Sequence, residues 1–227
     1  MKPLLLVLTI WALLALAVLL PATLLLQASF PIFTVIWIIF PLVTALRTKD
    51  PGRVGFRPVP WRIFLQTAAA NLALVLGIML LFEPWSHTYR MLLELVLSSN
   101  PPDTTFAWLL RFPRLPGLAG MALYSELVTL FGEELFFRGW LLQVLQKRLG
   151  VTWAVVLQAA LFVIPNLLVA LVLPALQGVL YALVYSWLAV GLVGGWAAAR
   201  TRSIWPSLVS ATISNLVLVA LIMNPGG

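Results

Sequence analysis

Four ionisable side chains lie within thirteen positions of a strongly apolar segment: Glu126, Glu133, Glu134 and Arg138. A charged side chain at the centre of a membrane span costs on the order of 3 kcal/mol, so such residues usually face the interior of a helix bundle and serve a function. Arg138 follows Glu134 by four residues, the favourable order for an ion pair on a helix. Glu133 lies about 100° around the helix from Glu134. The ion pair therefore leaves Glu133 directed toward a cavity or a neighbouring helix.

Two adjacent carboxylates, one paired and one free, suit a general base that activates water, provided that other groups stabilise an oxyanion. Glu126 precedes Glu133 by seven residues and returns to nearly the same helix face. The alternative interpretation is structural. In it, Glu134 and Arg138 form a buried ion pair that holds helices together, and burial keeps Glu126 protonated. Both interpretations stay open from these residues alone.

The composition shows which solvent must surround this segment. Of 227 residues, 62% are hydrophobic and 9% are charged, whereas a soluble domain has about 25% charged residues. The mean hydropathy is +1.05. The net charge of +7 does not indicate nucleic acid as a partner, because the basic residues lie at the ends of apolar segments. The absence of cysteine excludes thiolate metal sites.

Long apolar segments predict a polytopic membrane protein with a lipid bilayer as its surroundings. Only helices pair every backbone group within one membrane-spanning segment, so we predict an all-α transmembrane bundle. The chain is expected to form a single integral membrane domain, 1–227, with an additional interfacial or re-entrant helix within 84–114. The seven expected spans are 3–26, 28–46, 63–83, 117–146, 152–173, 176–199 and 203–223.

The short loops indicate an orientation, because cytoplasmic loops carry an excess of Lys and Arg. With the N-terminus inside, the inner loops hold ten basic residues and the outer loops hold three. We therefore predict a cytoplasmic N-terminus and a C-terminus outside. A chain with this charge bias fits a bacterial inner membrane best.

The pattern Glu133-Glu134-x-x-x-Arg138 resembles the first motif of the CPBP family, the intramembrane proteases related to CAAX prenyl endopeptidases and bacteriocin-processing proteins. The basic loop "GFRPVPWR", which places Trp61 at the head of the third span, fits the same family. The resemblance covers a protease-like core of about 50–220. It implies a second motif, Phe-x-x-x-His, on the next helix and a third, His-x-x-x-Asn or Asp, on a later helix.

The second and third motifs depart from the family pattern. Phe162 is present in the second, but Asn166 stands where the family has histidine. The third has Trp205 and Asn215, but Ala211 stands at the histidine position. In the family, one glutamate and these two histidines are thought to hold a metal or to position the catalytic water. The missing imidazoles remove the ligands that zinc prefers. The resemblance therefore implies the scaffold rather than the activity, and we predict no zinc cofactor.

The other polar residues offer few replacements. The single histidine, His87, is in the outer loop, so we expect it at the surface or interface rather than beside Glu133. Carboxylate and amide oxygens suit Mg²⁺ or Ca²⁺ rather than zinc, and we predict no metal site. A metal-free reaction would use Glu133 as the base and Asn166 and Asn215 as amide donors to an oxyanion. The alternative for each asparagine is an interhelical hydrogen bond.

Three functions follow from these observations. The first is a catalytically impaired protease homologue, a pseudoprotease that binds a membrane protein or lipidated partner in its intramembrane cavity, with Glu126 and Asn166 as binding residues. The second is an active intramembrane endopeptidase, with Glu133, Glu134, Arg138 and Asn215 as its catalytic residues. The third is a structural or assembly subunit of a larger membrane complex.

Overall fold

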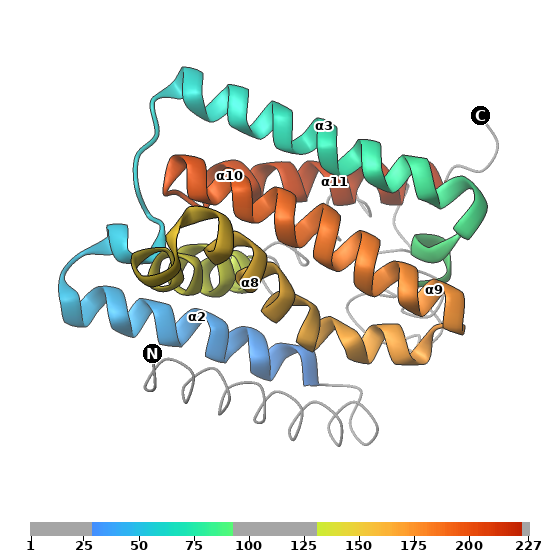
Figure 1. Ribbon diagram of the computed structural model, residues 1–227, viewed down its shortest axis with the longest axis horizontal. Helices are drawn as coiled ribbons and strands as arrows, with labels where there is room; N and C mark the ends of the chain where they lie inside the picture. The colour runs from blue at the N-terminus through green and yellow to red at the C-terminus, as the bar shows by residue number, and fades with distance from the viewer. Residues whose placement is uncertain (1–28, 93–130, 224–227) are drawn as a thin grey trace.

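The computed structural model describes residues 29–92 and 131–223, and every regular element in these ranges is helical (Figure 1). Two of the segments, η3 and η4, are π-helical. The last described residues before the gap, 88–92, are also helical. In chain order the elements are α2 (Ser29–Thr48), the 3-10 turn η1 (Pro51–Val54), α3 (Trp61–Ser86), α7 (Phe131–Glu133), η3 (Glu134–Leu141), α8 (Leu142–Val172), α9 (Ala175–Leu180), η4 (Tyr181–Val193), α10 (Gly194–Thr201) and α11 (Trp205–Met223).

The described part of the chain contains three helices that are long and apolar enough to cross a membrane: Trp61–Ser86, Phe131–Leu167 and Ala175–Thr201. Gly150 interrupts the second with φ 74° and ψ 173°, between the spans expected at 117–146 and 152–173. The all-α prediction is confirmed for the described residues. Seven spans and the orientation stay predictions. The first expected span, 3–26, Glu126 and most of the 84–114 loop lie outside the described residues.

The helix that contains the two glutamates continues without a break from α7 through η3 into α8. Glu133 and Leu142, which flank η3, have ordinary helical angles. Within η3 the backbone is wound more loosely, and the Leu142 N–H reaches the carbonyl of Phe137 five residues earlier. Such π-helical segments are rare and are found frequently at functional sites. η4 has the same winding and packs against both α8 and α3.

Aromatic side chains fill the space between η3, α8 and α2. Phe137 is fully buried and meets Phe162 of α8 edge-on, with ring centroids 5.1 Å apart. Trp37 of α2 contacts Phe137 in the same geometry at 5.7 Å. Edge-to-face pairs of this kind add about 0.5–1.5 kcal/mol each to the area that they bury. They fix η3 in the centre of the bundle.

The loop before α3 also enters the bundle. Val54 is fully buried, and its carbonyl occupies the space that a Cβ atom at position 139 would need. Gly139 is therefore required for the close approach of this loop to η3. The Ile204 N–H donates to the carbonyl of Gly55 at 3.1 Å, which joins the loop to the start of α11.

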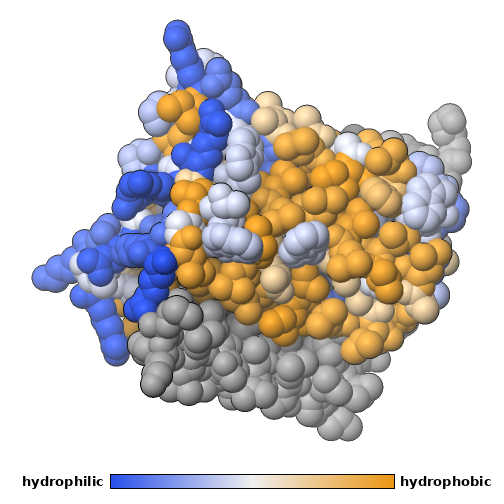
Figure 2. All heavy atoms as spheres, in the orientation of Figure 1, coloured by the Kyte–Doolittle hydropathy of each residue, from blue (hydrophilic) through white to orange (hydrophobic). Residues whose placement is uncertain are grey.

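The described surface separates into two regions (Figure 2). Hydrophobic residues cover the helices, whereas hydrophilic residues gather at the end where the α2–α3 loop lies. The apolar helices imply contact with a lipid bilayer.

Candidate functional site

Arg138 is almost completely enclosed, with 2% of its surface exposed. Its Nη1 atom is 3.3 Å from Oε1 of Glu134, so the ion pair expected from the sequence is present. Nη2 donates a hydrogen bond of 2.8 Å to the carbonyl of Val190 in η4. The guanidinium carbon lies 4.3 Å from the ring centre of Phe162. Arg138 thus joins η3 to α8 and η4.

Glycine makes room for this guanidinium. A Cβ atom at Gly194 of α10 would lie 3.4 Å from Nη2 of Arg138 and 3.6 Å from its Nε. A methyl group at this position would be in van der Waals contact with the guanidinium, so Gly194 packs directly against it. The Nε atom has no hydrogen-bond partner among the described residues. The Arg138 side chain is therefore held mainly through its terminal guanidinium nitrogens, which contact the Glu134 carboxylate and the Val190 carbonyl.

Glu134 has two kinds of partner, because Ser207 of α11 donates its hydroxyl to Oε2 while Arg138 pairs with Oε1. Only 1% of Glu134 is exposed. A buried ion pair recovers the cost of removing both charges from water only when further hydrogen bonds satisfy its atoms, and Ser207 supplies one of them. The arrangement fixes the Glu134 carboxylate and ties η3 to α11.

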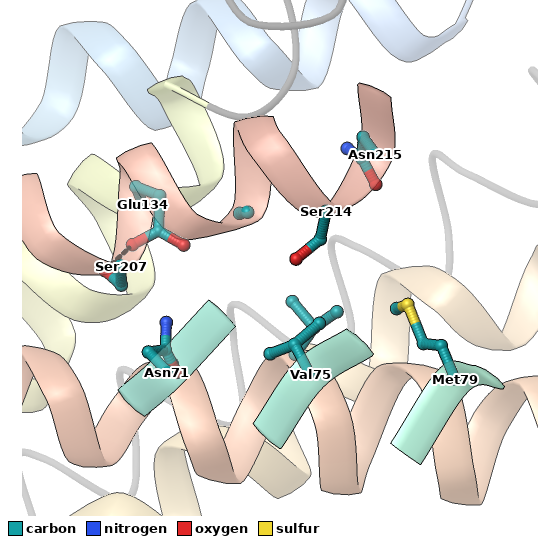
Figure 3. Close-up of a pocket in the computed structure, with 10 residues that line it drawn as sticks. Asn71, Val75, Met79, Glu134, Ser207, Ser214 and Asn215 are labelled. Atoms are coloured by element: carbon teal, nitrogen blue, oxygen red, sulfur yellow. Dashed lines mark hydrogen bonds between the residues drawn. The ribbon is translucent and has the colours of Figure 1, made fainter. Parts of the chain in front are cut away.

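A small cavity of about 30 Å³ lies beside Glu134 (Figure 3). This volume holds one or two water molecules and is too small for a peptide. Figure 3 shows side chains of α3 facing those of η3 and α11 across it. The ten residues that line it are Asn71, Val75, Met79, Glu134, Val190, Gly194, Ser207, Ala211, Ser214 and Asn215.

The cavity has a polar side that the sequence analysis did not identify. Asn71 of α3 is buried and donates its amide to the hydroxyl of Ser210. Its Oδ1 atom has no hydrogen-bond partner among the described residues. Ser207 and Ser214 line the cavity, and Ser210 supports Asn71. The spacing of serines 207, 210 and 214 along α11 is the helical signal that could have revealed this face.

Glu133 lies on a different side of the helix. It is 7% exposed and does not line the cavity. No hydrogen bond or ion pair joins its side chain to the described residues, although it is close enough to Tyr181 to interact electrostatically. The sequence directs Glu133 toward a cavity or a neighbouring helix; it lies near Tyr181 of the neighbouring η4, and the small cavity described above is lined by Glu134. Ser207 of α11, which also lines the cavity, donates to Glu134, and Arg138 of the same helix pairs with it.

Asn166 lies beside Tyr181, whose hydroxyl donates to its Oδ1 at 3.0 Å. The Asn166 amide donates to the carbonyl of Phe162, one turn earlier in α8, at 2.9 Å. The bond from Tyr181 joins two helices, so Asn166 makes the interhelical hydrogen bond that the sequence analysis gave as its alternative role. Both ends of the side-chain amide are occupied, and the electrostatic contact of Tyr181 with Glu133 places this pair near the free glutamate.

Asn215 is the last residue along the cavity. Its Oδ1 accepts a hydrogen bond of 3.4 Å from the hydroxyl of Tyr89. Partial burial, and then the Glu83 carboxylate, raise the pKa of Tyr89 to about 12, so this hydroxyl keeps its proton at neutral pH. His87 is exposed and ends α3 in a left-handed conformation, with its N–H bonded to the carbonyl of Glu83. As expected, it is a surface residue and does not line the cavity.

A second carboxylate lies at the far end of α3. Oε2 of Glu83 accepts a 2.6 Å hydrogen bond from the hydroxyl of Tyr185. The backbone N–H groups of Tyr89 and Arg90 donate to the two oxygens of Glu83 at 2.9 Å each. Glu83 therefore caps the helical segment 88–92 and joins it to η4. No motif in the sequence marked Glu83 for this role.

Comparison with known proteins bears on this geometry. Residues 115–217 match the family model described as type II CAAX prenyl endopeptidase Rce1-like. This segment is therefore similar to that family. It contains η3, with the two glutamates and Arg138, and continues through most of α11. The comparisons with curated proteins and with solved structures find no match.

The described side chains at the motif positions do not fit a zinc ion. Among the described residues no three His, Cys, Asp or Glu side chains lie close enough together to hold a metal. Asn166 and Ala211, at the two positions where the resemblance implies histidine, offer one amide that is already hydrogen-bonded and one methyl group. The Glu134 carboxylate is engaged by Arg138 and Ser207. A zinc site needs about four ligands with thiolate or imidazole donors, and this set supplies none.

Proposed function

We propose that this chain is a catalytically impaired member of the Rce1-like group, a pseudoprotease that binds a membrane protein or a lipidated partner without cleaving it. One observation carries the proposal. Apart from Glu133, the polar side chains at the motif positions are already used in contacts within the helix bundle. The Glu134 carboxylate pairs with Arg138 and Ser207, and the Asn166 amide binds Tyr181 and Phe162. Such groups are not available to a substrate without breaking contacts between helices.

The size of the cavity limits where a partner binds. About 30 Å³ beside Glu134 has room for water and none for a peptide. A partner helix or lipid chain therefore binds on the apolar helix surface, or enters only after the helices separate. This differs from a partner held inside the cavity, which was the form of the proposal suggested by the sequence.

A second function, an active endopeptidase, is favoured by one specific observation. The cavity brings the Glu134 carboxylate beside the unpaired Oδ1 of Asn71 and the side chain of Asn215. A water molecule bound there would meet a carboxylate and amide groups, which are the groups of a metal-free hydrolase. In this alternative Glu134, rather than Glu133, is the base.

The test measures cleavage and binding on the same preparations. The chain is reconstituted in liposomes with a prenylated peptide that ends in a CAAX sequence, and cleavage is followed for the wild type, Glu133→Gln and Glu134→Gln. The proposal expects no cleavage by any of them and retention of co-purifying membrane partners by Glu133→Gln. Cleavage by the wild type that either variant abolishes would establish the endopeptidase instead.

Restoring the histidines provides the matched experiment. The double variant Asn166→His with Ala211→His supplies the two imidazoles that the resemblance implies. If impairment results from their loss, zinc binding appears in the double variant and not in Asn166→His alone. Native mass spectrometry measures the bound metal directly. Zinc bound by the wild type itself would contradict the proposal.

A further inference from the structure

One end of the described molecule is strongly basic. It is the end formed by the α2–α3 loop, the segment around Gly150 and the α10–α11 turn, where Figure 2 shows the hydrophilic residues gathered. The only described acidic residue in these segments is Asp50, which pairs with Arg53 at 3.3 Å. The basic residues are Arg47, Lys49, Arg53, Arg57, Arg62, Lys147, Arg148, Arg200 and Arg202.

Exposed tryptophans mark the same helix ends. Trp61 begins α3, Trp153 follows Gly150, and Trp205 begins α11, and all three are exposed. Trp196, near the end of α10, lies 5.6 Å from the guanidinium of Arg200. Tryptophan gathers at the headgroup level of a bilayer, where its ring meets both lipid and water. The basic end is therefore placed at the depth of the phosphate groups.

Two hydrogen bonds join the loop that contains Arg57 to the turn that contains Arg202. The hydroxyl of Ser203 donates to the carbonyl of Arg57 at 2.9 Å, and the next residue, Ile204, donates its N–H to Gly55. Arg202 adjoins Ser203 and has a left-handed backbone with φ 52°. The loop that contains Arg57 is thus fastened directly beside the turn that contains Arg202.

Both guanidinium groups are available to a ligand. The Nε of Arg57 donates to the carbonyl of Gly52 at 3.2 Å, which orients the side chain. Its terminal nitrogens have no partner among the described residues, and Arg202 is exposed without a hydrogen bond or ion pair to them. Asp50, which pairs with Arg53, is the only described acidic residue in these segments, so an anion that contacts both arginines would be stabilised by their charge. The planar guanidinium matches phosphate in particular.

We propose that Arg57 and Arg202 together bind the phosphate of an anionic phospholipid headgroup. The surrounding basic residues attract anionic lipid to this end, and the two arginines at the loop–turn junction form the specific contact. Neither the family match nor the proposed function requires such a site.

Bound phosphate would also hold the α2–α3 loop in its docked position. It would bridge the loop to the α10–α11 turn, parallel to the Ser203 and Ile204 hydrogen bonds. The loop places Val54 against Gly139, and Ile204, whose N–H binds the Gly55 carbonyl of the loop, lies three residues before Ser207, the partner of Glu134. Headgroup binding is therefore expected to stabilise the whole protein and to be detectable in its unfolding temperature.

The experiment titrates the protein, purified in neutral detergent, with phosphatidylglycerol or with phosphatidylcholine of the same acyl chains. For the wild type we expect phosphatidylglycerol to raise the unfolding temperature by several degrees, and phosphatidylcholine to have no comparable effect. Arg57→Gln with Arg202→Gln should lose this difference. The matched control, Lys147→Gln with Arg148→Gln, removes the same charge from the same end and should keep it.

Three outcomes would overturn the proposal: no preference for phosphatidylglycerol in the wild type, an unchanged preference in the arginine variant, or an equal loss in the control, which would indicate diffuse charge only. Inorganic phosphate at millimolar concentration is titrated in parallel. If inorganic phosphate raises the unfolding temperature as much as phosphatidylglycerol does, the site binds free phosphate rather than a lipid headgroup, and the proposal is wrong. Should the arginine variant not fold, Arg57→Lys with Arg202→Lys keeps the charge but loses the planar fork, and native mass spectrometry counts its retained phosphatidylglycerol against the wild type.

Discussion

Glu134 and Glu83 each place a carboxylate in the apolar helix bundle, and the two carboxylates are stabilised by different kinds of partner. Glu134 is nearly inaccessible and is balanced by the full charge of Arg138, with Ser207 as an additional donor. Glu83 is only partly buried and is satisfied by neutral donors, Tyr185 and two backbone N–H groups. The comparison teaches that a charge deep between helices is matched by a charge, whereas one near a helix end is satisfied by backbone donors and a hydroxyl.

The largest expected effect is at the ion pair. Arg138→Met leaves the Glu134 charge buried without its partner and removes the hydrogen bond to Val190. We expect the free energy of unfolding, measured by SDS titration in mixed micelles, to fall by about 3–5 kcal/mol. The control is Glu134→Gln combined with Arg138→Met, which should recover part of the loss because no buried charge remains. A loss below about 1 kcal/mol would show that the pair is not what stabilises η3.

At Glu83, the second carboxylate, we expect a smaller loss in the free energy of unfolding. Glu83→Ala removes three hydrogen bonds to a charged group, but water reaches the partly exposed site and replaces some of them. We expect a loss of about 2 kcal/mol in the same titration, and about half of that for Glu83→Gln, which keeps an acceptor. A loss from Glu83→Ala as large as that from Arg138→Met would contradict the distinction between the two regions.

Removing single hydroxyl groups measures how much each neutral donor contributes to the free energy of unfolding. Tyr185→Phe removes only the 2.6 Å hydrogen bond to Glu83 and should cost about 1 kcal/mol. Tyr181→Phe removes the bond to Asn166 between two neutral groups and should cost about 0.6 kcal/mol. The order of the two values is the informative result, and the reverse order would mean that the charge on Glu83 does not strengthen its bond.

The smallest expected effect is the coupling between the two regions. Glu83 and Arg138 share no hydrogen-bond partner. The losses from Glu83→Ala and Arg138→Met should therefore add to within about 0.5 kcal/mol in the double variant. A larger coupling energy would show that η4, which contacts both regions, transmits strain between them.

Much of the first region could be predicted from the sequence. The spacing of Glu134 and Arg138 predicts their pairing, because residues four apart share a helix face and this contact needs no other helix. The all-helical fold follows from composition, since an apolar chain in lipid must pair its backbone groups internally. The Glu-Glu-x-x-x-Arg motif also led to the family that residues 115–217 match.

The cavity and the second region could not be predicted in this way. Which glutamate lines the cavity depends on Ser207, more than seventy residues later in the chain. The roles of Asn71, Tyr181 and Glu83 depend on partners in other helices or beyond the helix end, and the winding of η3 and η4 changes the direction of each side chain along them.

The sequence alone determined that the helices lie in a lipid bilayer, that the fold is helical, and which contacts form within one helix turn. Composition and short-range geometry decide these features. The tertiary structure decided which polar groups are used up as contacts between helices and which remain free. Glu134 and Glu133 are adjacent residues of the same type, yet one is bound from two sides and the other has no bonded partner among the described residues. That difference arises because packing brings Ser207 of α11 to the Glu134 carboxylate and not to Glu133.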